Sequence, residues 1–258
     1  MSAVETATDE ARRAAAAAID ARGTDETEWL AAQLPDRLPH LTLPAGPVVV
    51  VAAHPDDEVL GFGGATAALL AAGRDVHTVC LSDGEASHGP LPPAGRAALA
   101  ARRRAELAAA LRELGDLPAP VHGGLPDTGL DRHEDRAQDV IGELLDAVGA
   151  ALCVAPWEGD LHSDHEAAGR AARKAARDRA VPVWSYPVWM WHWARPHDDR
   201  VPWDRAGVLP LTETAVARKR AALARFTSQL EPRGPGVAPV LPPQEIAHHT
   251  RAFETVIR

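Results

Sequence analysis

Two short polar clusters interrupt the apolar stretches of this chain, and their residue types are those of a metal centre. The first is AHPDDE at residues 53–58, and the second is HSDH at residues 162–165. Consecutive acidic side chains repel one another and are costly to desolvate, so an acidic cluster beside apolar residues indicates a compensating cation. Imidazole and carboxylate are ordinary zinc ligands, and His54 with Asp57 supplies one of each.

A catalytic zinc takes three protein ligands, and the second cluster is the expected source of the third. His162 and His165 are three residues apart, so they share a face if the first turn of a helix includes both. Two aspartates after a strand also suit magnesium and phosphoryl transfer. The histidines oppose that alternative, and the chain lacks a GxxxxGK[ST] phosphate-binding loop. A metal-dependent sugar-binding protein without catalysis is a third hypothesis.

Both clusters follow predicted strands of one sheet. Residues 47–53 form a continuous apolar, β-branched run typical of a buried strand, and a glycine-rich helix ending at Gly73 separates it from a second strand at 74–82. Such a βαβ unit implies parallel strands. The pattern continues with helices at 95–114, 133–148 and 164–178 and strands near 119–123 and 150–155. The sequence therefore predicts an open, mostly parallel α/β sheet, whose ligands bind beyond the carboxyl ends of the strands.

Length and composition fit a single domain. With 258 residues, 46% hydrophobic and 24% charged, the chain can bury one large core. We expect a core at 47–178, an N-terminal helical extension at 1–40 and a C-terminal subregion at 182–258. Further expected elements are helices at 9–33, 213–227 and 243–254, an extended segment at 181–193 and a surface loop at 232–243.

The net charge and the two cysteines indicate which classes of partner and which cellular compartment to expect. The net charge of -9 argues against nucleic acid and anionic membranes as partners and favours a small molecule. Cys80 and Cys153 each lie in an apolar run, which predicts buried thiols in a reducing compartment. The acidic N-terminus does not read as a secretory signal, and no long uncharged apolar stretch is present. We therefore expect no membrane span and a cytoplasmic location.

The ordered motifs resemble those of the PIG-L/LmbE family of zinc-dependent N-deacetylases. Besides AHPDDE and HSDH, which match the family's AHPDDE and HxDH, the chain carries SDGEA at 82–86, RRAEL at 103–107, Leu114-Gly115 and LPDTG at 125–129. The resemblance covers about residues 47–178 and implies a Rossmann-like three-layer α/β/α fold. It also implies hydrolysis of the N-acyl group, above all N-acetyl, of an amino sugar or glycoconjugate, releasing a carboxylate and a primary amine. An amidase acting on a thiol conjugate or a natural product is the alternative.

Carried over residue by residue, the resemblance implies that His54, Asp57 and His165 bind Zn²⁺, with Fe²⁺ or Co²⁺ also compatible. Asp56 would be the general base, and His162 would stabilise the oxyanion or protonate the leaving amine.

The neighbouring residues are expected to position the site or to contact the substrate. Asp164 is expected either as a helix N-cap or as a partner that orients His162 or the Asp56 region, and Glu58 as a brace of its loop. Candidate substrate contacts are Glu85, Arg103, Asp127 and Trp157. Trp189, Trp191 and Trp193 share one face if their segment is a strand, and they either pack in the core or form a wall for a sugar, acyl or aglycone group.

Overall fold

The computed structural model describes residues 14–15, 17–19 and 21–258, so the helix expected at 9–33 lies partly outside the described residues. The strands are β1 Val48–Ala52, β2 Val76–Ser82, β3 Val121–Leu125, β4 Leu152–Pro156, β5 Val183–Tyr186, β6 Ala206–Pro210 and β7 Phe253–Ile257. The helices are α2 Glu26–Ala31, α3 Leu34–Arg37, α4 Asp57–Ala71, α5 Pro93–Leu114, α6 Glu134–Val148, α7 Ser163–Arg177, α8 Met190–Trp193, α9 Glu213–Leu223, α10 Thr227–Leu230 and α11 Pro243–His248, with short 3₁₀ turns at Leu130–Arg132 and Trp203–Arg205.

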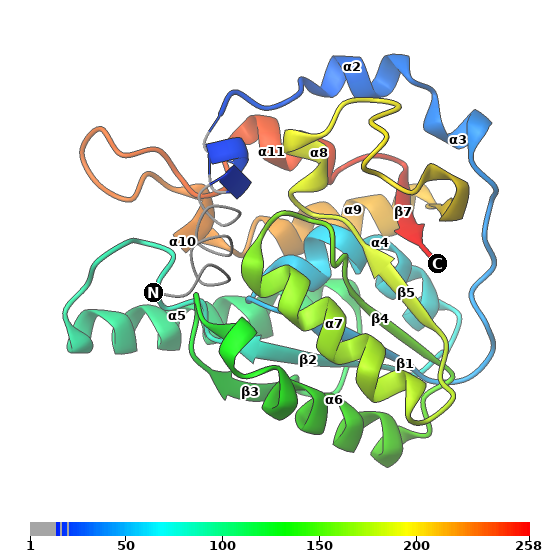
Figure 1. Ribbon diagram of the computed structural model, residues 1–258, viewed down its shortest axis with the longest axis horizontal. Coiled ribbons are helices and arrows are strands. Elements are labelled where there is room, and N and C mark those ends of the chain that lie inside the picture. The colour runs from blue at the N-terminus through cyan, green and yellow to red at the C-terminus, as the bar shows by residue number, and fades with distance from the viewer. Residues whose placement is uncertain (1–13, 16, 20) are drawn as a thin grey trace, which may run out of the picture.

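A seven-stranded sheet in the order β3-β2-β1-β4-β5-β7-β6 runs through the molecule (Figure 1). The first five strands are parallel, whereas β7 pairs antiparallel with both β5 and β6. The predicted mostly parallel sheet is therefore confirmed. The chain turns from β1 to β2 on one side and reaches β4 on the other, so β1 and β4 flank the point where strand order reverses. In open α/β sheets this is where ligands bind.

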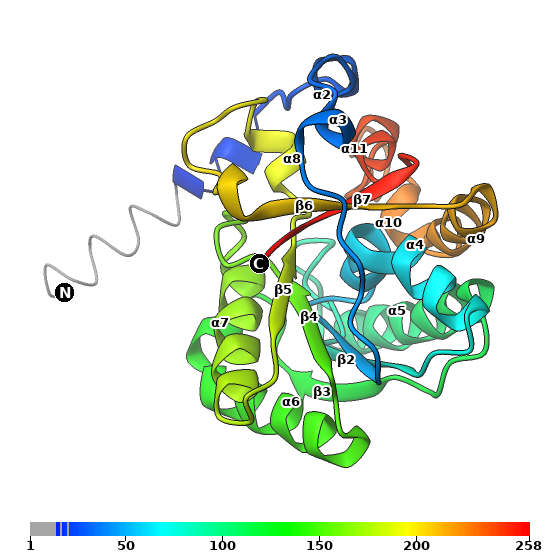
Figure 2. The same cartoon turned by 90° about the vertical axis from the view of Figure 1, so that its right-hand side faces the viewer.

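Helices cover both faces of the sheet, which explains why its strands read as continuous apolar runs. Val48 and Val50 of β1 pack into a core with α4, α5 and α9, whereas Val49 and Val51 pack against α6 and α7. Figure 2 shows the two helical layers on either side of the strands. The expected three-layer α/β/α arrangement is confirmed.

The C-terminal region differs from the sequence expectation. The segment expected to be extended over 181–193 forms β5 and then turns into the helix α8. Its turn is held by the buried carboxylate of Asp160, which accepts the backbone N–H groups of Val188, Trp189 and Met190. The helix expected at 243–254 is also wrong beyond His248, because the chain then leaves α11 and adds β7 to the sheet.

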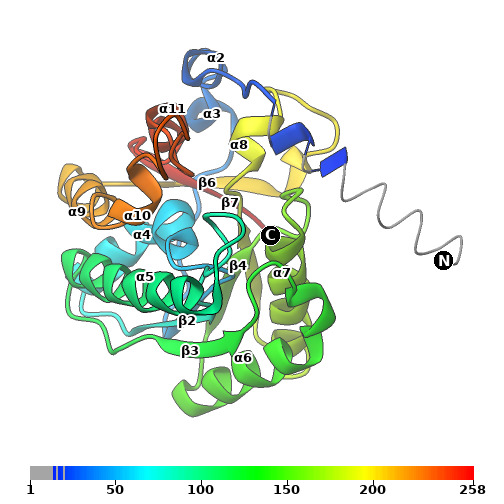
Figure 3. The ribbon, with the colours of Figure 1, turned by 90° about the vertical axis from the view of Figure 1, so that its left-hand side faces the viewer.

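Helices α2 and α3 pack on the C-terminal subregion, whereas Leu41 and Leu43 pack on the core that contains β1. Trp29 of α2 donates a hydrogen bond from Nε1 to the Trp191 carbonyl at 2.8 Å, and the two rings meet edge to face with centroids 5.0 Å apart. Figure 3 shows α2, α8 and α11 gathered at one end of the molecule. Both cysteines are buried and free, as expected. Among the described residues, no helix combines the length and apolar character needed to cross a membrane.

Candidate metal centre

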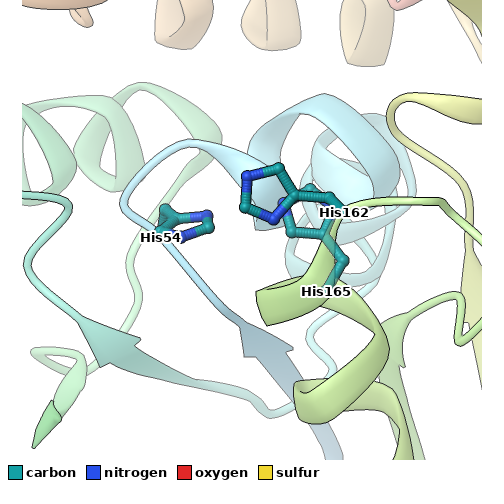
Figure 4. A group of neighbouring side chains, drawn as sticks. All are labelled: His54, His162 and His165. Carbon is teal, nitrogen blue, oxygen red and sulfur yellow. The ribbon is translucent and has the colours of Figure 1, made fainter. Parts of the chain in front are cut away.

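Three histidine side chains meet where the strand order reverses. His54 lies in the loop after β1, His162 directly precedes α7, and His165 is in the first turn of that helix. Each contributes a ring nitrogen to a group whose members all lie within 4.8 Å of one another (Figure 4). The two polar clusters of the sequence are thus brought to one place by parallel neighbouring strands.

Asp57 lies between two of these rings. It opens α4, and its Oδ2 accepts the backbone N–H groups of Ala53 at 3.0 Å and His54 at 2.8 Å. Oδ2 is also 3.5 Å from His54 Nδ1, and Oδ1 is 3.2 Å from His165 Nε2. The trio His54, Asp57 and His165 expected from the resemblance is therefore close together, and His162 joins it as a fourth potential donor.

These donors fit a divalent cation. His162 Nδ1 is buried and has no hydrogen-bond partner among the described residues, although a buried polar atom left unpaired is costly. Burial, together with the neighbouring His165 and His54, lowers the pKa of His162 to about 3, so its ring is neutral and keeps a free lone pair. Imidazole nitrogens with one carboxylate suit zinc, iron or cobalt better than magnesium.

The surroundings of the trio favour positive charge. Burial opposes protonation of His165, but Asp57 and Asp160 raise the pKa of that imidazole to about 9. Burial likewise works against His54, whose pKa is nonetheless raised by Asp127, Asp164 and Asp57. Burial alone would raise the pKa of Asp57, yet His165 and His54 hold it well below its usual range. The site therefore has a surplus of acidic groups that attracts a cation.

Asp56 faces a different partner from its neighbour. Its backbone has φ 144°, a value that non-glycine residues rarely adopt and that costs conformational energy. Its Oδ2 accepts a hydrogen bond from Arg103 Nη2 at 3.1 Å, and Arg103 also donates to the carbonyls of Pro55 and Gly84, both at 2.9 Å. Burial raises the pKa of Asp56 to about 7, with the Arg103 guanidinium opposing that shift. Glu58 is buried behind this loop, and its Oε2 accepts the Asp56 N–H at 3.4 Å.

Two further acidic side chains contact the Nε2 atom of His54. Its Nε2 is 3.2 Å from Asp127 Oδ1 and 3.2 Å from Asp164 Oδ2. Asp164 also accepts the backbone N–H groups of Thr128 at 2.7 Å and Leu130 at 3.1 Å. The N-cap role considered for Asp164 is wrong, because α7 begins at Ser163 with His162 as its N-cap. Its carboxylate contacts His54, which lies in the same loop as Asp56, and no hydrogen bond between Asp164 and His162 is found among the described residues.

Asp160 is the residue that sequence reasoning missed. It is fully buried, and its Oδ2 lies 2.7 Å from His165 Nδ1 while both oxygens accept the N–H groups that open α8. A carboxylate on the outer nitrogen of a ligand histidine fixes the tautomer and the ring orientation. The only signal in the sequence is an acid five residues before His165, which looks like any polar loop residue.

A cavity of about 200 Å³ opens at this centre. His54, Asp56, Asp57, His162 and His165 are among its lining residues, as are Arg103 and Asp127. Two of the expected substrate contacts do not line it. Glu85 instead accepts the Asp127 N–H through Oε1 at 3.2 Å. The expectation for Trp157 is corrected, because its ring is buried and stacks on Trp193 within an apolar cluster.

Comparison with known proteins finds a protein family that matches the same region of the chain. The PIG-L family model, described as GlcNAc-PI de-N-acetylase, matches residues 49–176. The chain is 30% identical over 206 residues to a 1D-myo-inositol 2-acetamido-2-deoxy-alpha-D-glucopyranoside deacetylase of Streptomyces avermitilis, covering 70% of this chain and 68% of the relative. It is 33% identical over 132 residues to a probable N-acetyl-alpha-D-glucosaminyl L-malate deacetylase 2 of Bacillus subtilis, covering 50% and 59%. The matched stretches thus span only part of these relatives.

Solved structures share the fold at low identity. A zinc-inhibited form of teicoplanin deacetylase Orf2 matches with a TM-score of 0.59 at 20% identity, over 82% of this chain and 97% of that chain. GalB, a 4-carboxy-2-hydroxymuconate hydratase of Pseudomonas putida KT2440, matches with a TM-score of 0.57 at 24% identity, over 72% and 80%. Because a hydratase shares this architecture with deacetylases, the reaction has to be argued from the site itself.

Proposed function

The chain belongs to the PIG-L family, and on that premise we propose that it is a metal-dependent N-deacetylase. It would hydrolyse the N-acetyl group of an amino sugar or a glycoconjugate and release acetate and a primary amine. The observation that carries the proposal is the meeting of His54, Asp57 and His165, with Asp56 beside them, in the lining of one cavity. The Streptomyces and Bacillus relatives, which are named as deacetylases of N-acetylglucosamine derivatives, support it.

The metal would be held by His54, Asp57 and His165. Zinc is the cation we propose, and Fe²⁺ or Co²⁺ would accept the same donor set. When bound, such a cation supplies a Lewis acid for the amide carbonyl and lowers the pKa of a water molecule. The protein's own contribution is to hold these side chains still, through the Asp57 hydrogen bonds to the loop after β1 and the Asp160 contact with His165.

Asp56 would act as the general base. Its carboxylate lines the cavity, and Arg103 fixes its direction while also holding the carbonyls of two neighbouring loops. A pKa of about 7 suits proton acceptance near neutral pH, because a base works best when its pKa lies near the working pH.

His162 would stabilise the oxyanion that forms on the substrate carbonyl. Because burial keeps its imidazole neutral, the ring has one N–H to donate to developing negative charge and no proton to spare for the amine. The low pKa of His162 therefore favours the first of the two roles considered for it.

A substrate panel tests the proposal. The chain is loaded with zinc and incubated with N-acetylglucosamine, its methyl glycoside, its inositol and malate conjugates, and N-acetylcysteine conjugates that represent the alternative amidase. Amine and acetate are measured together, and a chelator-treated sample serves as the control. We expect equal amounts of amine and acetate from at least one amino sugar, and only with metal present. Zinc-bearing protein that releases no amine from any member would contradict the proposal.

Location and partners are part of the same proposal. The substrate would be a small molecule, with no nucleic acid partner. Two free, buried thiols support a cytoplasmic location, because such cysteines persist in reducing compartments.

A further inference from the structure

One part of the cavity lining is apolar. Leu60, Val188, Trp189, Val240 and Leu241 line the same cavity as the histidines. They come from α4, from the segment between β5 and α8, and from the loop before α11. An acetyl group offers one methyl to such a surface, so most of this wall is left for another part of the substrate.

Asp160, which contacts the proposed metal ligand His165, also holds part of this apolar wall in place. Asp160 accepts the N–H groups of Val188 at 3.1 Å and Trp189 at 2.9 Å, in addition to its contact with His165 Nδ1. On the other side, the Leu241 N–H donates to the Gln229 carbonyl at 2.9 Å. The apolar side chains are therefore preformed at a fixed position relative to the reacting centre, which lowers the cost of ordering them on binding.

The lining holds little that would bind an acidic group. Among the described residues that line the cavity, Arg103 is the one arginine or lysine, and its guanidinium is engaged by Asp56 and two backbone carbonyls. Apart from the histidines of the proposed metal centre, the other described lining side chains are acidic, neutral polar or apolar, so a carboxylate attached to the sugar finds no free cation among them. Burying an unpaired charge there is strongly unfavourable.

We infer that the substrate carries an apolar substituent on its amino sugar and that this group packs against the wall formed by Leu60, Val188, Trp189, Val240 and Leu241. The inference rests on the proposed function and adds to it the class of substrate. The apolar group can be an aglycone on the sugar or an N-acyl chain longer than acetyl. Both sources present the same chemistry to the wall.

Four substrates of the zinc-loaded full chain separate these cases. The reference is methyl 2-acetamido-2-deoxyglucopyranoside, and the others are its octyl glycoside, its N-octanoyl analogue and the malate conjugate. We expect one octyl compound to exceed the reference in kcat/KM by at least ~10-fold, mainly through a lower KM, because buried methylene groups add binding energy. The octyl compound that gains identifies the source of the apolar group.

The opposite results are equally clear. Reference turnover without a gain for either octyl compound overturns the inference but leaves the proposed deacetylase standing. A malate conjugate that is the best substrate also overturns the inference alone. Release of no amine from any of the four overturns the proposed function with it.

A matched pair of variants tests the wall itself. Val240 lines the cavity, whereas Val237 lies on the same loop, is 45% exposed and does not line it. We expect Val240→Asp to bring the octyl-to-methyl ratio of kcat/KM close to unity and Val237→Asp to keep the wild-type ratio. Zinc content and circular dichroism check that both variants fold, and Trp189→Ala repeats the test if Val240→Asp does not. An unchanged ratio in the wall variant would refute the assignment.

Discussion

Asp56 and Asp57 are adjacent carboxylates with opposite properties, and their neighbours explain the difference. Asp57 accepts two backbone N–H groups and faces two imidazoles, which keep its pKa far below the usual range despite burial. Asp56 turns away through its unusual backbone angle, and Arg103 is its one ion-pair partner among the described residues; burial raises its pKa to about 7, although Arg103 opposes that shift. One of the pair is thus suited to holding a cation and the other to accepting a proton.

Removing the charge of Asp56 alone should separate these functions. Asp56→Asn keeps the shape and an acceptor for Arg103, so we expect full metal content and at least ~100-fold lower kcat, as for a lost general base. Zinc content and turnover are measured on the same sample, with the exposed Asp36→Asn as control. Normal turnover by Asp56→Asn would show that another group activates the water.

Asp160 should act on the metal through His165. Asp160→Asn presents an amide to His165 and to three N–H donors, so we expect zinc affinity to fall by about 10–100-fold, as is typical for such outer partners. His165→Ala should lose the metal itself. Competition with a chromogenic chelator measures both, and Glu166→Gln, beside His165 but partly exposed, is the control. An unchanged zinc affinity in Asp160→Asn would exclude the positioning role.

At the scale of elements, side chains from β7 and α9 form hydrogen bonds with the backbone of helix α4. Glu254 of β7 accepts the backbone N–H groups of Gly64 at 2.7 Å and Ala65 at 2.8 Å, while Lys219 of α9 donates to the Leu60 carbonyl and to Glu254. The Cβ of a side chain at Gly64 would lie too close to the side chain of Leu211. The glycine-rich sequence after HPDDE therefore serves close packing of the helix that presents Asp57.

The Lys219–Glu254 pair should be costly to break. Both side chains are buried and 2.6 Å apart, so Lys219→Met leaves the charge of the buried Glu254 carboxylate without its cationic partner. We expect the free energy of unfolding to fall by about 3–5 kcal/mol. Urea denaturation measures it, and Lys174→Met is the control because its partner Asp135 is exposed, which limits the loss to about 1 kcal/mol. Equal losses in the two variants would contradict a structural role for the buried pair.

At the scale of the whole molecule, the parallel half was predictable and the C-terminal half was not. β1, β2 and β4 are buried on both faces, so their apolar runs identify them without knowledge of their neighbours. β6 and β7 have the same length as β1 and β4, but their pairing depends on residues distant in the chain, such as Ala206 with Ile257. The helical turn α8 depends on Asp160, about thirty residues upstream, and no local pattern shows that contact.

The residues of the candidate site also fall into those that the sequence predicts and those that it does not. Residues contiguous in AHPDDE and HSDH were found from type and spacing, because a metal centre needs those donors at strand ends. Asp160 and the aliphatic members of the wall were missed, since each acts through tertiary contacts, whereas Trp189 was among the tryptophans for which a wall was one of two expected roles. The expected face of three tryptophans fails because α8 turns the chain, and only Trp189 of the three lines the cavity.

We propose that the described segment 21–258 unfolds as one unit. Thr24 and Leu41 hydrogen-bond to His192 and Val208, which ties the segment before β1 to the C-terminal subregion. All seven tryptophans lie outside the strands of the β1–β4 core. We expect the denaturation midpoints from tryptophan fluorescence and from far-ultraviolet circular dichroism to coincide. Two separate midpoints would indicate independent domains.

The most direct test of a metal-dependent deacetylase is a titration of metal-free protein with zinc, with turnover of the best substrate of the panel measured at each step. We expect no amine release without metal and a rise in amine release in proportion to zinc occupancy of one site per chain. His165→Ala, titrated in parallel, should stay inactive over the same range. Full turnover by the chelated protein, or by His165→Ala at the same zinc concentration, would contradict this expectation.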